Sequence, residues 1–126
     1  MVSSACPFCS LPAERIWFQT DSAIVFLDGF PVSPGHTLII PKKHIASFME
    51  LPDQERQEVW NLAQRVRQLL KEKHNPDGFN FGVNEGTAAG QTVPHAHFHV
   101  IPRFNGDVPD PKGGVRWVVP AKAKYW

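Results

Sequence analysis

Apolar and polar positions along the chain divide it into short strand-like runs and one long helical stretch. Short apolar or alternating runs bounded by turn residues are typical of strands, and five such runs occur, at residues 16–19, 23–28, 37–40, 79–84 and 96–101. The third run stops at Pro41, and a short helical turn is expected near residues 45–50.

The long helical stretch begins at Pro52, a residue that suits a first helical position. Apolar side chains then recur at three- and four-residue spacing and form one stripe, at Val59, Leu62, Ala63, Val66, Leu69 and Leu70. Acidic residues come early and basic residues late, which complements the helix dipole. The sequence Asn75-Pro76-Asp77-Gly78 ends the helix.

These elements predict an α+β domain with a five-stranded antiparallel sheet, one long helix and one short helix. The whole chain, 1–126, is interpreted as a single domain with a core of about 6–104 and a C-terminal tail at 105–126. The tail has no clear period, and we expect it to be ordered only where residues 115–119 and Tyr125-Trp126 dock.

Composition and charge exclude several classes of protein. The chain is 42% apolar and 20% charged, as soluble globular proteins are, and its net charge of +1 provides no broad basic field for nucleic acid. No apolar run reaches membrane-spanning length. The N-terminus lacks the basic and apolar segments of a secretory signal, so a cytoplasmic protein is expected, without nucleic-acid or membrane partners.

The most unusual feature is a row of three histidines, His95, His97 and His99, which alternate with Ala96, Phe98 and Val100. On a strand, alternate side chains share a face, so the histidines are predicted to face solvent, a metal or a ligand while the apolar residues face the core. Such a row can bind a metal or supply a nucleophilic imidazole. The loop before it, residues 84–92, has backbone N–H groups and small polar side chains that suit a phosphate or an oxyanion.

Both cysteines lie in one motif, Cys6-Pro7-Phe8-Cys9. In a reducing compartment, this spacing is typical of a metal site or a redox pair rather than of a structural disulfide.

The sequence His95-Ala96-His97-Phe98-His99-Val100-Ile101 resembles the motif of the histidine triad (HIT) superfamily, His-x-His-x-His followed by two apolar residues. Further similarity covers Asp28 to His44, with Val32-Ser33-Pro34-Gly35-His36 and Ile40-Pro41-Lys42-Lys43-His44, and also Asn84-Glu85-Gly86 and Gly90-Gln91-Thr92. The resemblance implies the HIT-like fold and a homodimer in which two sheets join into one.

The resemblance also implies roles for individual residues. His97 matches the nucleophile that forms a nucleotidyl-histidine, and His99 and His36 match the histidines that assist at the phosphate. Asp28 matches the acid that binds ribose. Phosphate-side positions are matched by Asn84, Gly90, Gln91 and Thr92. Phe26 and Leu38 fall where the family lines its base pocket, but we interpret them as plain core residues.

A second set of residues resembles the zinc site of some HIT proteins: Cys6, Cys9, His44 and His95. The resemblance implies a closed, structural zinc site, and no organic cofactor is expected. A redox pair and unligated thiols are the alternatives.

The expected function is hydrolysis of a nucleoside phosphoanhydride, with a purine nucleotide or a dinucleoside polyphosphate such as diadenosine tetraphosphate as the partner. His99 stands where the related galactose-1-phosphate uridylyltransferases have Gln, which favours water as the final acceptor. The alternatives are a nucleoside phosphoramidase, a nucleotide-binding or scaffold protein with little turnover, and a metalloenzyme that uses all three histidines directly.

Overall fold

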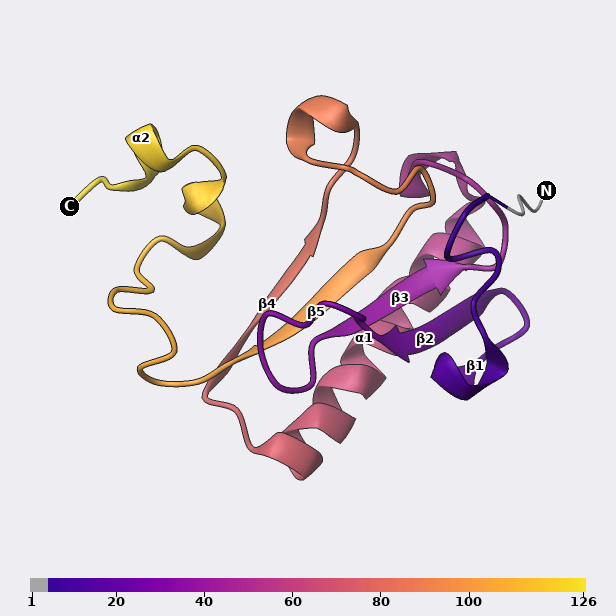
Figure 1. Cartoon of the computed structure of the whole chain (residues 1–126), viewed down its shortest axis with the longest axis horizontal. Helices are drawn as coiled ribbons and strands as arrows, with labels where there is room; N and C mark the ends of the chain where they lie inside the picture. The colour runs from indigo at the N-terminus through magenta and orange to yellow at the C-terminus, as the bar shows by residue number, and fades with distance from the viewer. Residues whose placement is uncertain (1–4) are drawn as a thin grey trace.

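The computed structural model describes residues 5–126 (Figure 1). Residues 1–4, which contribute to the expectation that no secretory signal is present, lie outside the described residues. One antiparallel sheet contains five strands in the order β1-β2-β3-β5-β4. The strands are β1 (Ile16–Gln19), β2 (Ala23–Leu27), β3 (Thr37–Pro41), β4 (Gly78–Val83) and β5 (Phe98–Arg103).

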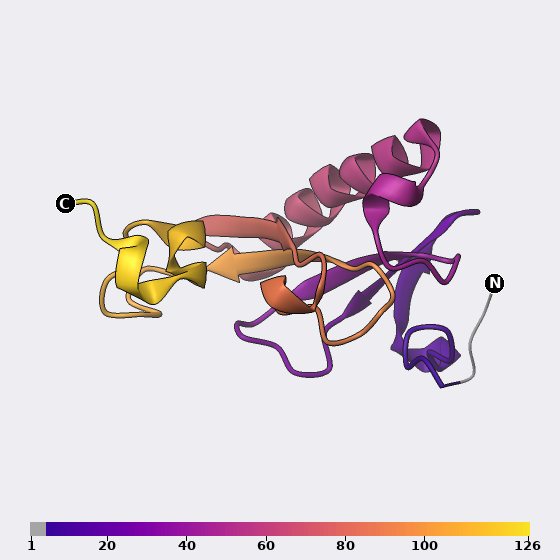
Figure 2. The same cartoon turned by 90° about the horizontal axis from the view of Figure 1, so that it is seen from above.

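The long helix α1 (Asp53–His74) covers one face of the sheet, while the loops that carry the predicted site lie on the opposite face (Figure 2). Its predicted stripe is the buried side, although Leu69 is only half-buried. Pro52 lies just before the first helical residue rather than on it, and Asn75 closes the helix in the left-handed conformation with φ 48°. The helix therefore forms as its 3.6-residue period predicts.

The strand β3 is the centre of the sheet and is buried along its whole length. Ile39 faces α1 and packs in the main core with Val66 and Val100. On the opposite face, Leu38 and Ile40 pack with Phe26. That second cluster is covered by the N-terminal loop through Phe8 and Leu11. β2 and β3 are apolar along nearly their whole length because both of their faces are covered, one by α1 and the other by the N-terminal loop.

The fifth strand begins two residues later than the sequence predicts, so only His99 of the three histidines lies on it. The predicted division of faces is confirmed, because Ala96, Phe98 and Val100 pack in the main core while the N-terminal loop contacts His95 and His97 through Phe8 on the other side. Pairing with β3 ends at Ile39 and Phe98. Further along β3 stands Pro41, which has no N–H to donate to a neighbouring strand. Its carbonyl accepts a hydrogen bond from His95 Nε2 at 2.8 Å, and Ala96 N donates instead to Ile45 O at 2.7 Å. His95 and His97 therefore lie in an irregular segment before β5.

The short helices also differ from expectation. The turn expected near residues 45–50 is the 3-10 helix η2 (Phe48–Glu50), capped by Ser47. The short α-helix is α2 (Pro120–Ala123), in the tail, where the sequence has no helical period. Three more 3-10 turns are η1 (Ala13–Arg15), η3 (Thr87–Ala89) and η4 (Gly114–Val118).

The tail follows β5 and lies beside the edge strand β4, and many of its contacts are within the tail itself (Figure 1). Arg116 donates to the carbonyls of Ala123 and Lys122 and lies 4.7 Å from the centre of the Tyr125 ring. Val118 and Tyr125 stay 77% and 71% exposed. Val115 and Val118 line a cavity together with residues of β4 and β5, so the expected docking occurs there with the side chains still largely exposed.

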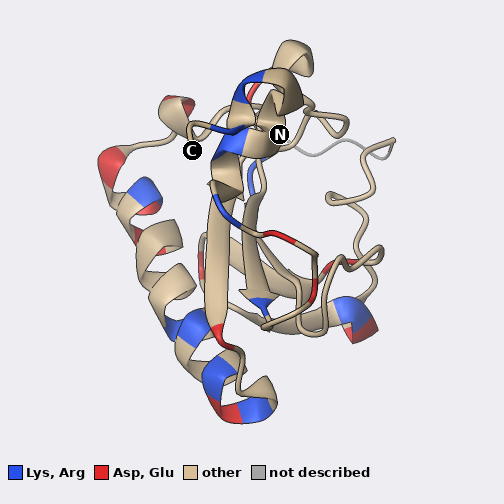
Figure 3. Ribbon diagram, turned by 90° about the vertical axis from the view of Figure 1, so that its left-hand side faces the viewer, with Lys and Arg blue, Asp and Glu red and all other residues tan. Residues whose placement is uncertain are grey.

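Charged residues of both signs are distributed along α1 rather than gathered in one field (Figure 3). Within residues 5–126, no helix is long and apolar enough to cross a membrane. Because β1 and β4 are the outer strands, each leaves one edge unpaired in the sheet. The expected homodimer stays a prediction.

Candidate functional site

A cavity of about 690 Å³ opens on the sheet face opposite α1, within the size range of small-molecule sites. Most of the predicted site residues line it, although they come from distant parts of the chain. They are Asp28, His36, Asn84, Gly90, Thr92, His97 and His99.

The geometry around His97 fixes which of its ring nitrogens can react. Its Nδ1 lies 2.9 Å from the backbone carbonyl of His95. A carbonyl oxygen only accepts, so Nδ1 carries a proton, and in the neutral ring the lone pair is on Nε2. His97 is 8% exposed and lines the cavity, and Nε2 has no hydrogen-bond partner among residues 5–126. In the neutral ring, Nε2 is therefore the nitrogen that can act as a base or nucleophile.

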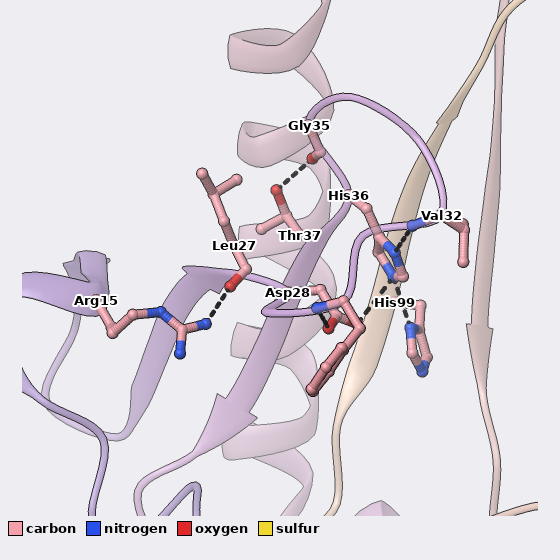
Figure 4. A network of polar contacts seen from close by, with 9 residues as sticks. Arg15, Leu27, Asp28, Val32, Gly35, His36, Thr37 and His99 are labelled. Carbon is pink, nitrogen blue, oxygen red and sulfur yellow. Dashed lines mark hydrogen bonds and ion pairs between the residues drawn. The ribbon is translucent and has the colours of Figure 1, made fainter.

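His36 and His99 form a directed chain of hydrogen bonds (Figure 4). The backbone N–H of Val32 donates to His36 Nδ1 at 3.1 Å, so the proton of the neutral His36 ring is on Nε2. His36 Nε2–H then donates to His99 Nδ1 at 2.9 Å. The remaining proton of His99 is on Nε2. Because the N–H of His36 is used in the bond to His99, the pair offers a ligand in the cavity one N–H group, the Nε2–H of His99.

Burial keeps this pair neutral. It lowers the pKa of His99 to about 4, and the neighbouring His97 and His36 add to the effect while Asp28 opposes it. Burial also lowers the pKa of His36, with Asp28 opposing. At neutral pH the two rings therefore act as hydrogen-bond donors and carry no charge.

Asp28, His36 and His99 place three potential metal-binding atoms close together, but the hydrogen bonds argue against a cation there. A metal would need the lone pair of His36 Nε2. That nitrogen holds the proton, because Nδ1 already accepts from Val32 N–H. Asp28 is fixed by Phe30 N–H, which donates to its Oδ1 at 2.9 Å, and its Oδ2 lies 3.5 Å from His36 Nε2. The cluster is arranged for hydrogen bonding.

The residues predicted to bind phosphate in the loop between β4 and β5 do not all line the cavity. Asn84, Gly90 and Thr92 line the cavity, whereas Gln91 is absent from its walls. The Gln91 side chain accepts from Gly86 N at 2.8 Å and donates to Ala46 O and Val93 O. Gln91 thus fastens the loop to the segment before η2 and holds its neighbours in place.

The sequence placed Phe26 and Leu38 at the base pocket of the family but gave no indication of Phe8 and Leu11 at the apolar end of the cavity. Phe26 and Leu38 are buried core residues, as interpreted, but they also line the cavity. Phe8 and Leu11, from the N-terminal loop, line it too, and Phe8 lies 5.2 Å from the His97 ring. The Cys6 and Cys9 pair was a usable signal, since anchoring it beside His95 brings residues 7–12 over β2.

Cys6, Cys9, His44 and His95 come together as a possible metal site, with their ligand atoms within 4.8 Å of one another. The Nδ1 atom of His95 lies 3.4 and 3.5 Å from the sulfurs of Cys6 and Cys9, and that of His44 lies 3.2 Å from Cys9. A tetrahedral zinc with its usual bond lengths separates sulfur and nitrogen ligands by about 3.5 Å. His95 Nε2–H donates to Pro41 O, which leaves Nδ1 free to bind. The donor set and its spacing fit a closed zinc site.

The comparisons with known proteins all point to one family. The HIT domain model matches residues 12–106. An uncharacterized HIT-like protein of Mycoplasma genitalium is 42% identical over 106 residues, which are 81% of this chain and 75% of the relative. A bis(5'-adenosyl)-triphosphatase of Dictyostelium discoideum is 39% identical over 94 residues, which are 75% of this chain and 63% of the relative.

Among solved structures, a Zn-bound histidine triad family protein from Mycobacterium smegmatis superposes with a TM-score of 0.73 at 36% identity, covering 94% of both chains. The triad His95, His97 and His99 lies within the matched residues. The chain therefore belongs to the HIT domain family.

Proposed function

We propose that the chain is a hydrolase of nucleoside phosphoanhydrides that acts through a nucleotidyl-histidine on His97. One observation carries the proposal. His97 Nδ1–H is fixed on the carbonyl of His95, so the lone pair of the neutral ring is on Nε2 and is available to a ligand in the cavity that His97 lines. A nucleophilic imidazole needs this tautomer and a neutral ring.

The chemistry takes two displacements. In the first, His97 Nε2 attacks the α-phosphorus, an N–P bond forms and the P–O bond to the leaving phosphate breaks. In the second, water attacks the same phosphorus, a P–O bond forms and the N–P bond breaks, which restores the imidazole and releases the nucleoside monophosphate. Nδ1 keeps its proton on the His95 carbonyl throughout.

The neighbouring groups suit the charge that builds up on phosphorus. The Nε2–H of His99 donates to a non-bridging oxygen, and His36 orients the His99 ring through its own N–H. Such a preorganised donor stabilises a developing negative charge. Asp28 accepts from the ribose hydroxyls. The purine occupies the apolar end of the cavity beside Phe8, Phe26 and Leu38.

The name of the Dictyostelium relative, bis(5'-adenosyl)-triphosphatase, supports a dinucleoside polyphosphate as substrate. The presence of His99 in the third position supports water as the acceptor. A phosphoramidase would use the same nucleophile with an amine as leaving group, and parallel rates on the two substrates separate these activities.

The nucleophile is tested by replacing His97 with Asn. Turnover of diadenosine tetraphosphate should fall by at least about 10³-fold, as loss of a covalent nucleophile does, while the Kd of AMP changes little. Rapid-quench mass spectrometry of the wild type should map an added nucleoside monophosphate to His97. A variant that keeps more than about a tenth of the activity would refute the mechanism.

We also propose that zinc occupies the Cys6, Cys9, His44 and His95 site. Zinc there neutralises thiolate charge and links the N-terminal loop to the segment that carries His97. These four residues complete a tetrahedron without His97, so the proposed metal role is structural rather than catalytic.

A further inference from the structure

A second cavity of about 360 Å³ adjoins the catalytic one on the side away from the N-terminal loop. The two cavities share four lining residues, Val32, His36, Asn84 and His99. His97 lines the first cavity and is absent from the second. The hydrogen-bonded pair of His36 and His99 therefore stands between them.

The positions of the two cavities match the geometry of a phosphoryl displacement. In a phosphoryl displacement, the attacking and leaving atoms lie on opposite sides of phosphorus. A phosphorus attacked by His97 next to His36 and His99 has its leaving group pointing away from His97, and the second cavity is the space beyond that pair.

We propose that the second cavity is the leaving-group subsite and binds the base of the second nucleoside of a dinucleoside polyphosphate. The inference rests on the proposed hydrolysis and names where the leaving half of the substrate binds.

The walls of the second cavity suit a flat, neutral ring. Its lining includes Ile101 from β5 and Val118 from the tail, and none of its lining residues is Lys, Arg, Asp or Glu. A polyphosphate would find no positive partner here, whereas the faces of a nucleobase can pack on the aliphatic side chains.

The side-chain amide of Asn80 gives the cavity a hydrogen-bond donor with a fixed orientation. Arg103 Nη1 donates to Asn80 Oδ1 at 2.6 Å, and Asp107 holds the same guanidinium through contacts of 2.8 and 2.9 Å. With its oxygen engaged, the Asn80 amide presents Nδ2, for which residues 5–126 supply no acceptor. A side chain at Gly114 would lie 3.5 Å from Nδ2, so glycine keeps the amide accessible. Asn80 is thus placed to donate to an acceptor on the edge of the base.

The cavity is tested with two single substitutions and a matched control. Val118→Glu puts a charge into the apolar wall, and Val118 is 77% exposed, so the fold should tolerate it. Asn80→Asp keeps an acceptor for Arg103 but removes the donor. Val119→Glu changes the adjacent valine, which is 53% exposed and does not line the cavity.

The measurement is kcat/KM on two adenylyl substrates, diadenosine tetraphosphate and adenosine 5'-phosphorimidazolide, whose leaving group is small. For Val118→Glu and Asn80→Asp, kcat/KM on diadenosine tetraphosphate divided by kcat/KM on the phosphorimidazolide should fall by about tenfold. That is the effect of losing one good contact. Val119→Glu should keep the wild-type ratio. An unchanged ratio in both test variants overturns the subsite while hydrolysis stands. A wild type that cleaves neither substrate overturns the proposed function as well.

Discussion

The lowered pKa of His99 predicts how stability depends on pH. The ring titrates near pH 6.5 in the unfolded chain and at about 4 in the folded one. Above pH 6.5 both states are neutral at this residue, and its contribution to stability is fully present. As the pH falls from 6.5 towards 4, the unfolded state binds the proton first, so stability is lost.

The size of this loss follows from the separation of the two pKa values. At about 1.4 kcal/mol per pH unit, the change from 6.5 to about 4 gives an upper value of about 3 kcal/mol. His99 is half-buried, and screening by solvent reduces the expected loss to about 2 kcal/mol.

His99→Gln isolates the effect, because glutamine can still accept from His36 Nε2–H but does not titrate. Urea unfolding of wild type and variant should be followed at intervals from pH 7.5 to 4.5. The free energy of unfolding should fall more steeply in the wild type, with the gap between the curves changing by about 2 kcal/mol. The contributions of His36 and His95 remain in both proteins. Parallel curves would refute a buried, neutral His99.

Two further predictions concern the metal site and one loop. Purified protein should contain about one zinc per chain, and Cys6→Ser should lose it and melt at a lower temperature, because metal binding contributes to folding stability. Elemental analysis that finds no zinc in chelator-free wild type would contradict the site. Gly35→Ala should destabilise the fold by about 1–3 kcal/mol, because an L side chain is strained at φ +89° and its Cβ would lie 2.9 Å from the His74 ring. Gly78→Ala, whose Cβ meets no atom within 4 Å, is the matched control in thermal melts, and equal melting temperatures for the two variants would show that the loop is not constrained as described.

The sequence by itself was sufficient for the elements whose signal is local. The stripe of α1 is a repeated pattern from Val59 to Leu70 within a helix of 22 residues, and Asn75 marks the end of the helix. The strands of the β1–β2–β3 meander were predicted to within one residue because turn residues bound them closely. The triad motif and its flanking matches were enough to indicate the family, since they depend on the order of residues and not on their contacts.

Tertiary contacts decided the chemistry of each histidine. Three imidazoles at equal spacing have equivalent patterns in the sequence, yet His95 donates to Pro41, His97 to the carbonyl of His95, and His99 accepts from His36. The partners of His95 and His99 lie 54 and 63 residues away, so no local pattern specifies which of their ring nitrogens carries the proton. The partner of His97 is only two residues away, but the contact forms in the irregular backbone before β5. Pro41, by lacking an N–H, also decided that the first two histidines leave the sheet.

The limits of the cavity were likewise set by packing between distant segments. Phe26 and Leu38 stand in apolar runs typical of core strands, and only the N-terminal loop that packs over them makes a cavity wall of their outer side. Gln91 lies in a motif that suits phosphate, but the carbonyls of Ala46 and Val93 occupy its amide. A polar side chain binds ligand or backbone depending on which acceptors the fold brings within about 3 Å of it. These distances are set by tertiary packing and cannot be predicted from the order of residues alone.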